Sequence, residues 1–276
     1  MTFFCFGAII MLMFDYHMHT HYSSDCSAPL SGQLDAAVKV GLQEVCLTDH
    51  IDFDQIENGK PLYPPANLVA LKKELETLRG FYPNLTIKRG AEVALNDEAC
   101  AQISLDYIKS AELDFVIGSL HVLNGLDVYR PEFFEGKQQK QAYKEYLEGL
   151  NRTIRTNSYF CAMGHYDFVA KNAPFADRAL AHSLAPEVFD DIFNYLIQSG
   201  KTLELNTSAW RNDAPWGLAV FTRFRELGGE FVTVGSDAHQ HVRVGARFSE
   251  AYELLRAAGI RYVATYDKMK PVFHKI

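Results

Sequence analysis

Residues 11–20 read MLMFDYHMHT, a short apolar run followed by two histidines that are separated by one residue. Such a run predicts a buried strand, and side chains along a strand alternate between its two faces. His17 and His19 therefore point to the same side at the carboxyl end of this strand. Imidazole is the commonest metal-binding side chain, so the pair predicts part of a metal site. The rest of the chain has to supply the remaining ligands.

The composition is that of one large folded domain. The chain has 276 residues, of which 48% are hydrophobic and 22% are charged, and its length falls within the range of single-domain α/β barrels. The net charge is −7, with no run of Lys or Arg. Because binding to a phosphate backbone needs clustered cations, we expect no polymeric nucleic acid as a partner. We expect a single domain over residues 1–276.

The apolar start of the chain differs from a targeting segment. Residues 1–14 contain no Lys or Arg, whereas a signal peptide begins with cations and ends at a small-residue cleavage site. The run is also too short to span a bilayer ahead of His17. We interpret residues 1–12 as an upstream extension and expect no membrane association. Five scattered cysteines without a Cys-x-x-Cys pattern predict reduced thiols and a cytoplasmic location.

Strand-like runs alternate with helical patterns along the chain, which is typical of βαβ units and a parallel sheet. The expected strands cover residues 12–16, 44–48, 85–88, 114–119, 159–163, 202–205 and 230–234, with a further strand at 262–265. The expected helices cover residues 31–41, with Ser31 as N-cap, and 68–78, 97–107, 131–156, 186–198, 218–227 and 248–258. This alternation predicts an α/β fold.

Most of the predicted strands end in a histidine or a carboxylate, and Asp25 lies on the loop after the first strand. The candidate ligands are His17, His19, Asp25, His50, Glu92, His121, His165, Asp237 and His239. One such residue alone is more often a hydrogen-bonded loop residue or a helix cap, as Asp49 could be. Chance does not bring so many to one edge, which in parallel barrels is the active-site rim. They exceed what one ion can hold, so we expect two or three ions that share a bridging group.

The motifs that carry these residues resemble, in order, those of the PHP (polymerase and histidinol phosphatase) superfamily. The matching segments are His17-Met-His19-Thr20, Thr48-Asp49-His50, Gly90-Ala-Glu92-Val, Gly118-Ser-Leu-His121, Gly164-His165-x-Asp167 and Gly235-Ser-Asp237-Ala-His239. The resemblance covers residues 15–258. It implies a distorted seven-stranded (β/α)7 TIM-like barrel with the metal site at the C-terminal rim of the strands. It also implies two to three divalent transition-metal ions (Zn, Mn or Fe).

The resemblance further implies how the ligands are shared, motif by motif. The first ion would be held by His17, His19, Glu92 and Asp237, the second by Glu92, His121 and His165, and the third by Asp25, His50 and His239. Many members of the superfamily have a histidine where this chain has Asp25. A carboxylate is a harder ligand than imidazole, so the resemblance leaves the identity and occupancy of the third metal open. We expect His21, His182, His241 and His274 not to be ligands.

As to activity, the resemblance implies a metal-dependent phosphate monoester hydrolase with Glu92, Asp237 and His239 as catalytic residues. A metal-bridging water, whose pKa is lowered to about 7, would supply hydroxide, so no Ser or Cys nucleophile is needed. The chain length and the run Leu205-Asn206-Thr207-Ser208-Ala-Trp210-Arg211 resemble the stand-alone histidinol-phosphate phosphatases. The expected reaction is therefore hydrolysis of L-histidinol phosphate in histidine biosynthesis.

Candidate substrate contacts follow from the charge of a phosphate monoester. Arg211 is the first candidate for a phosphate clamp, because guanidinium binds phosphate through two parallel hydrogen bonds. Further candidates are Lys171, Arg243 and Arg247. An amino-imidazole group would need a carboxylate or an aromatic ring, for which the candidates are Asp52, Asp54, Tyr63 and Trp210.

Other functions stay open at this point. Another PHP phosphoesterase, acting on nucleotides, short oligonucleotides or phosphotyrosine, would share every metal ligand. A hydrolase of carbonyl substrates on a similar barrel usually needs a carbamylated lysine, and no lysine lies in the strand-end motifs that carry the candidate ligands. A non-catalytic metal-binding domain is the alternative from another class, and it would be expected to lack one of the ligands.

Overall fold

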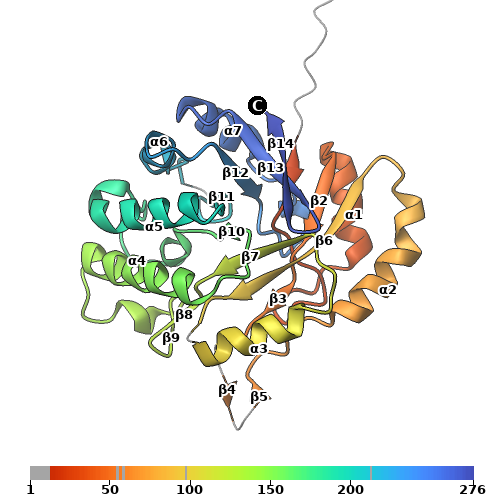
Figure 1. The fold of residues 1–276 in the computed structure, drawn as a ribbon, viewed down its shortest axis with the longest axis horizontal. Coiled ribbons are helices and arrows are strands. Elements are labelled where there is room, and N and C mark those ends of the chain that lie inside the picture. The colour runs from red at the N-terminus through yellow and green to blue at the C-terminus, as the bar shows by residue number, and fades with distance from the viewer. Residues whose placement is uncertain (1–12, 54–55, 58–59, 97, 212) are drawn as a thin grey trace, which may run out of the picture.

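The computed structural model describes residues 13–276 except 54–55, 58–59, 97 and 212. Parallel strands occupy the middle of the molecule and helices lie around them (Figure 1). The predicted α/β fold is thereby confirmed. The interpretation of residues 1–12 lies outside the described residues.

One main sheet contains most of the strands. In the order of their hydrogen-bonded neighbours these are β1 (Phe14–Asp15), β2 (Glu44–Leu47), β6 (Thr86–Ala94), β7 (Phe115–Ser119), β10 (Ala162–Met163), β11 (Thr202–Asn206), β12 (Phe231–Gly235), β13 (Tyr262–Asp267) and β14 (Lys270–Lys275). All pairs from β1 to β13 are parallel, and β14 returns antiparallel to β13. β3 (His50–Ile51) also pairs with β6, and two short ribbons are formed by β4 (Ile56–Glu57) with β5 (Lys60–Pro61) and by β8 (Val122–Leu123) with β9 (Leu126–Asp127).

The chain just beyond β1 joins the two sides of this sheet. It is hydrogen-bonded toward β12 by Tyr16 N to Val234 O (2.9 Å), Asp237 N to His17 O (2.7 Å) and His19 N to Ala238 O (3.0 Å). On its other side, Thr48 N donates to Met18 O (2.9 Å). Residues 16–19 therefore lie between the ends of β2 and β12, so the histidine pair is held by backbone bonds from both neighbours.

The helices cover the outside of the strands (Figure 1). They are α1 (Leu30–Val40), α2 (Leu68–Leu78), α3 (Glu98–Ile108), α4 (Gln139–Thr156), α5 (Pro186–Gln198), α6 (Leu218–Glu226) and α7 (Phe248–Ala257). Gly41 ends α1 in the left-handed conformation with φ 82°, where glycine carries no steric cost. Ser31 does not cap α1, contrary to the prediction, because the helix already begins at Leu30 behind Pro29.

Two predicted elements differ most in their bounds, each for a physical reason. The expected helix over residues 131–156 is a short 3₁₀ turn (Pro131–Phe134) followed by α4, because Gly136 takes φ 70° and breaks the helix. The expected strand at 85–88 continues to Ala94 as β6, since its second half pairs with β3 and β7. Glu92 therefore lies within a strand, paired in register with His50.

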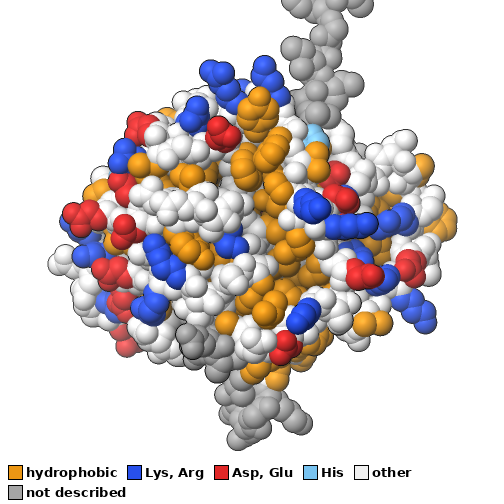
Figure 2. All heavy atoms as spheres, viewed as in Figure 1, with side chains coloured by type: hydrophobic (Ala, Val, Ile, Leu, Met, Phe, Trp, Pro, Cys, Tyr) orange, Lys and Arg blue, Asp and Glu red, His pale blue; other side chains and the backbone are white. Residues whose placement is uncertain are grey.

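The strand expected at 262–265 is the first arm of the β13–β14 hairpin. Tyr266 N donates to the hydroxyl of Tyr16 (2.7 Å), which ties this hairpin to the start of the sheet. On the face of the molecule that Figure 2 shows, hydrophobic side chains lie over the middle, where Figure 1 places β13 and β14. Val272 and Phe273 of β14 are both exposed, so β14 lacks the alternation that would have predicted it. Among the described residues, no helix combines the length and the apolar character that crossing a membrane requires.

Candidate metal centre

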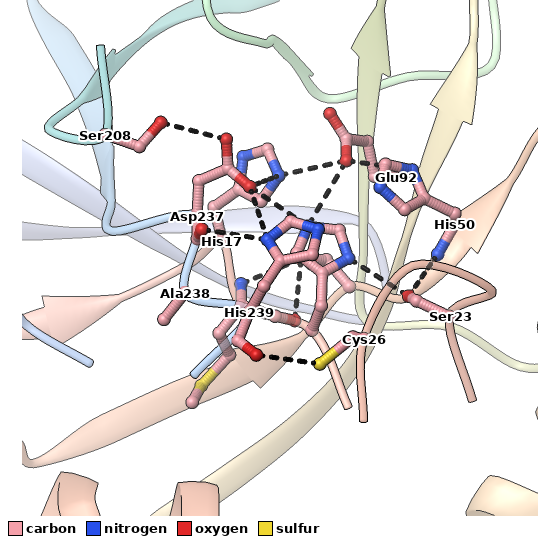
Figure 3. A network of polar contacts seen from close by, with 12 residues as sticks. His17, Ser23, Cys26, His50, Glu92, Ser208, Asp237, Ala238 and His239 are labelled. Atoms are coloured by element: carbon pink, nitrogen blue, oxygen red, sulfur yellow. Dashed lines mark hydrogen bonds and ion pairs between the residues drawn. The ribbon is translucent and has the colours of Figure 1, made fainter. Parts of the chain in front are cut away.

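The predicted metal ligands converge on one cavity at the carboxyl ends of the parallel strands. The cavity has a volume of about 920 Å³, and the predicted ligands that line it are Asp25, His50, Glu92, His121, His165, Asp237 and His239. His17 and His19 are fully buried behind them. In Figure 3 the labelled histidines and carboxylates point toward one another from different strands. The structure therefore brings all the predicted ligands together.

Glu92 lies at the centre of the cluster, and its two carboxylate oxygens face different histidines. Oε2 is 3.1 Å from His17 Nε2, 3.4 Å from His19 Nε2 and 3.2 Å from His50 Nδ1. Oε1 is 2.8 Å from His165 Nε2 and 3.3 Å from His121 Nε2. A carboxylate that bridges two metal ions needs this division of its oxygens between two sets of ligands.

Asp237 is the second buried carboxylate, and it follows the end of β12. Its φ of 52° is a left-handed conformation, which costs energy for a residue with a Cβ atom. Oδ1 is 3.3 Å from His19 Nε2 and 3.7 Å from His17 Nε2. Oδ2 faces the ammonium group of Lys171 and accepts a hydrogen bond from Ser208 Oγ (3.0 Å). The strained turn thus directs one oxygen to the histidine pair and the other to the cavity wall.

Asp25, His50 and His239 form a third group on the more open side of the cavity. Asp25 Oδ2 is 3.0 Å from His239 Nε2 and 3.6 Å from His50 Nε2. The Asp25 side chain is 54% exposed, in contrast to Glu92 at 1%. The rings of His19 and His239 stack with their centroids 4.1 Å apart. This group therefore adjoins the buried cluster but faces solvent.

The donor atoms fit divalent transition metals. Among the described residues, four sets have ligand atoms within 4.8 Å of one another: His19, His50 and His239; His17, His165 and Asp237; His17, His19 and Glu92; and His50, Glu92 and His121. In this part of the chain, His17 Nε2, His19 Nε2 and both Glu92 oxygens are buried and make no hydrogen bond. Buried polar atoms are seldom left without a partner, so their convergence indicates metal ligands. Mixed imidazole and carboxylate sets suit Zn, Mn or Fe.

Electrostatics favour bound positive charge in this cluster. Burial raises the pKa of the Glu92 carboxyl, but the imidazoles of His17, His50, His121 and His165 outweigh burial and hold the pKa well below 4.5. Burial lowers the pKa of His17, whereas the carboxylates of Glu204, Glu92 and Asp237 raise it well above 6.5. The carboxylates therefore stay ionised, and their negative charge is balanced by positive charge within the cluster, which protons on the imidazoles or bound metal ions can supply.

Two supports of the histidine pair were missed by the sequence-based reasoning. Glu204 Oε1 is 2.7 Å from His17 Nδ1, and a charged residue inside the apolar run of β11 was the available signal. His19 Nδ1 is 3.1 Å from Ser23 Oγ, which in turn donates to Asp49 (2.8 Å). Asp49 therefore binds the loop after β1 and does not cap a helix.

The structure brings three of the four predicted phosphate contacts into the cavity wall. Lys171, Arg211 and Arg243 line the cavity. Arg247 is not among the lining residues: its guanidinium donates to the Arg211 and Asp213 carbonyl oxygens and to Glu250. Arg247 thus supports the loop that carries Arg211.

Other lining residues come from irregular segments that the sequence pattern did not single out. Arg130 and Tyr129 follow β9, and Arg211 Nη2 donates to the hydroxyl of Tyr129 (2.6 Å). The cavity also contains Asp52 and Tyr63, both of them candidates for contact with the organic part of a substrate. Of the other two candidates, Trp210 is buried in the core and Asp54 lies outside the described residues. His21, His182, His241 and His274 belong to none of the metal-binding sets found in the described part of the chain.

Comparison with known proteins gives concordant results. Residues 15–208 match the family model of the PHP domain. A histidinol-phosphatase of Lactococcus lactis is 30% identical over 271 residues, which cover 94% of this chain and 96% of the relative.

Two solved structures have a fold similar to that of this chain. A crystal structure of histidinol phosphate phosphatase from L. lactis, complexed with zinc, L-histidinol and phosphate, has a TM-score of 0.83 and 28% identity. The match covers 94% of this chain and 98% of that one. A structure from Listeria monocytogenes has a TM-score of 0.71 and 20% identity, and the match covers 86% of this chain and 99% of that one. At this identity the match shows a similar fold alone.

Proposed function

The chain belongs to the PHP domain family, and on this basis we propose that it is a metal-dependent histidinol-phosphate phosphatase. It hydrolyses L-histidinol phosphate to L-histidinol and phosphate, a step of histidine biosynthesis. The observation that carries the proposal is the position of Glu92, whose two oxygens face separate histidine groups at a cavity lined by Lys171, Arg211 and Arg243. The likeness to the L. lactis phosphatase, over nearly the full length of both chains, supports the same conclusion.

The fold that positions this site is a distorted seven-stranded barrel. Seven of the parallel strands, β1, β2, β6, β7, β10, β11 and β12, follow one another as neighbours and β13 comes after them. The hydrogen bonds from residues 16–19 to the chain around Val234 and Ala238 support closure between the first and the last of them. We treat the whole chain, residues 1–276, as one domain.

The clustered side chains would hold two to three divalent ions (Zn, Mn or Fe). His17, His19, Glu92 and Asp237 would hold the first ion, Glu92, His121 and His165 the second, and Asp25, His50 and His239 the third. Bound ions of this kind supply a hydroxide nucleophile near neutral pH and stabilise charge on the phosphoryl and leaving oxygens. We take Glu92, Asp237 and His239 as the catalytic residues, since Glu92 faces two histidine groups and His239 Nδ1 lies 3.4 Å from Asp237 Oδ1.

The charges at the metal site and along the cavity wall favour a phosphate monoester as substrate. Three divalent cations would bring more positive charge than Asp25, Glu92 and Asp237 return, so the metal-loaded site would suit a dianion better than a neutral group. Lys171, Arg211 and Arg243 extend this positive charge along the cavity wall. Guanidinium groups bind phosphate oxygens through two parallel hydrogen bonds, so Arg211 and Arg243 are suited to hold the phosphate group.

The cavity also offers contacts for an amino-imidazole group. Asp52 lines it, and its Oδ2 is 3.3 Å from His50 Nδ1 while its Oδ1 is buried without a hydrogen-bond partner among the described residues. Tyr63 and Tyr129 add aromatic surface at the wall. A carboxylate and aromatic rings are what a cationic heteroaromatic amine requires. The binding partner is thus a small-molecule substrate. Separately, the five scattered cysteines lead us to place the enzyme in the cytoplasm.

A panel of phosphate monoesters tests this proposal. The metal-reconstituted protein would be assayed with histidinol phosphate, phosphotyrosine, 3′- and 5′-nucleotides and p-nitrophenyl phosphate under the same conditions. We expect the highest kcat/KM for histidinol phosphate. If histidinol phosphate turns over no faster than p-nitrophenyl phosphate, the assignment is wrong, and a nucleotide or phosphotyrosine as the best substrate would identify the alternative phosphoesterase.

A further inference from the structure

Glu204 is a buried carboxylate on β11 that belongs to none of the metal-binding sets described above. Its side chain is only 1% exposed. Oε1 accepts from His17 Nδ1 (2.7 Å), and Oε2 accepts from the backbone N–H of His165 (2.9 Å) and from Asn206 Nδ2 (3.2 Å). The same carboxylate thus touches two of the proposed ligands, which face opposite oxygens of Glu92.

The neighbouring strand leaves room for this contact. A Cβ atom on Gly235 of β12 would lie 2.3 Å from Glu204 Oε1 and 2.3 Å from the Cβ atom of His17. Such distances do not occur between non-bonded atoms, so a side chain at this position would displace the carboxylate or the imidazole. The absence of a side chain at Gly235 allows the pair to form.

The contact determines which nitrogen of His17 is free to bind metal. An ionised carboxylate only accepts hydrogen bonds, so Nδ1 must carry the proton. In the neutral imidazole that binds metal, the lone pair is then on Nε2, the atom that lies 3.1 Å from Glu92 Oε2 and 3.7 Å from Asp237 Oδ1. A carboxylate on the far nitrogen of a ligating histidine fixes its tautomer and ring orientation and raises its basicity.

We propose that Glu204 is a positioning residue that holds His17 in the metal-binding tautomer and, through the amide of His165, sets the spacing between the first and second metal groups. The inference rests on the proposed function, because it takes His17 and His165 as ligands. A purely structural role for Glu204 would link β11 to the segments that follow β1 and β10 without affecting which nitrogen of His17 binds metal.

Glu204→Gln distinguishes these roles because it keeps the size of the side chain. Glutamine offers one acceptor and one donor group in place of two acceptor oxygens. If its amide NH₂ faces His17, the imidazole turns to the tautomer with the proton on Nε2, where the metal should bind. If its oxygen faces His17, the NH₂ group meets the N–H of His165, and two donors oppose each other. Either arrangement weakens the metal site.

Zinc affinity, measured by competition with a chromophoric chelator on metal-stripped protein, tests the proposal without relying on activity. We expect Glu204→Gln to weaken zinc binding by roughly 10- to 100-fold, which is the usual effect of losing such a partner. Thr233→Val is the matched control, since Thr233 pairs with Glu204 in register on β12, is equally buried, and has a hydroxyl without a hydrogen-bond partner in the described chain. The control should bind zinc within about two-fold of wild type. Equal zinc affinity in Glu204→Gln and wild type would overturn the proposal.

A second measurement uses wild-type protein, in case the variant does not fold. Long-range ¹H–¹⁵N spectra of the zinc-loaded, histidine-labelled protein report the tautomer of each imidazole, and His17→Asn identifies the His17 signal by its loss. We expect a protonated Nδ1 and a zinc-bound Nε2, whereas zinc on Nδ1 would overturn the inference. The proposed function fails separately, if wild-type protein binds no zinc or does not hydrolyse histidinol phosphate.

Discussion

The ammonium group of Lys171 pairs with Oδ2 of Asp237, while Oδ1 of the same carboxylate faces the histidine pair. One aspartate thereby connects the metal cluster to the cationic wall of the cavity. Burial lowers the pKa of Lys171, but Asp237 outweighs burial and raises it above 10.5, so the side chain is charged whenever substrate binds. Lys171 lines the cavity, so with metal bound to Asp237 its ammonium group would be available to a phosphate oxygen.

Lys171→Met should therefore weaken substrate turnover more than metal binding. A hydrogen bond to a charged group contributes about 1.5–3 kcal/mol, so we expect kcat/KM for histidinol phosphate to fall by roughly 10- to 100-fold. Metal content by plasma mass spectrometry should stay near that of wild type, because no proposed metal ligand is removed. Lys144→Met is a suitable control, since Lys144 is an exposed residue of α4. A variant with unchanged kcat/KM would exclude Lys171 from substrate binding.

Glu92→Ala should remove metal and activity together. Glu92 is the group that faces both histidine sets, and its loss leaves five imidazoles around an empty centre. We expect at least one ion fewer per chain and a fall in kcat of roughly 100-fold or more. Metal content and kcat are measured on the same preparation, with Glu148→Ala on the exposed face of α4 as control. Full metal occupancy with full activity in Glu92→Ala would refute the shared-ligand scheme.

The positions of the candidate ligands could be predicted because they follow a simple rule. Parallel strands bring their carboxyl ends to one rim, so polar residues that end apolar runs, such as His17, His165 and Asp237, must meet there. The rule needs only the strand period and not the exact bounds. Glu92 was found in this way although β6 runs two residues past it.

The supports of the ligands could not be predicted by the same rule. Ser23 and Asp49 meet through a loop conformation that no periodic pattern encodes. The residues of the cavity wall could not be predicted from a periodic pattern either, since Tyr129 and Arg130 reach the cavity from a turn after β9. Arg247 carries the charge expected of a phosphate contact, but its guanidinium is taken up by backbone carbonyls and Glu250, which only the tertiary structure reveals.

The ion pair between α5 and α6 predicts a pH dependence of stability away from the metal site. Asp190 accepts hydrogen bonds from Arg223 Nε (3.0 Å) and Nη2 (2.7 Å), and these lower its pKa below 3.8. The folded state therefore binds this proton more weakly than the unfolded state. The stabilisation is present above about pH 4 and is lost as the pH falls through the folded-state pKa.

Asp190→Asn should accordingly destabilise metal-free protein by about 1 kcal/mol at pH 7, a modest value because the pair is partly exposed. The difference from wild type should shrink when urea unfolding is repeated at pH 3. Asp191→Asn, at an exposed position one residue further along α5, should change little at either pH. A constant difference between Asp190→Asn and wild type across this range would show that the carboxylate charge is not what stabilises the contact.

Ser23 provides the last prediction, because its hydroxyl supports the second histidine of the pair. Ser23 Oγ donates to Asp49 (2.8 Å), so it accepts from His19 Nδ1 (3.1 Å) and from the backbone N–H of His50 (3.0 Å). With Nδ1 as donor, the lone pair of His19 is on Nε2, which faces Glu92 and Asp237.

Ser23→Ala should therefore lower zinc affinity by roughly ten-fold, at the lower end of the usual range for such partners because the carboxylate acts through a hydroxyl. Chelator competition measures this effect, and Ser27→Ala, at an exposed position of the same loop, is the control. Since His17 has its own acceptor in Glu204, combining Ser23→Ala with Glu204→Gln removes both supports of the pair. The combined loss should then be at least the product of the single losses. A double variant no weaker than Glu204→Gln alone would mean that His19 needs no support from Ser23.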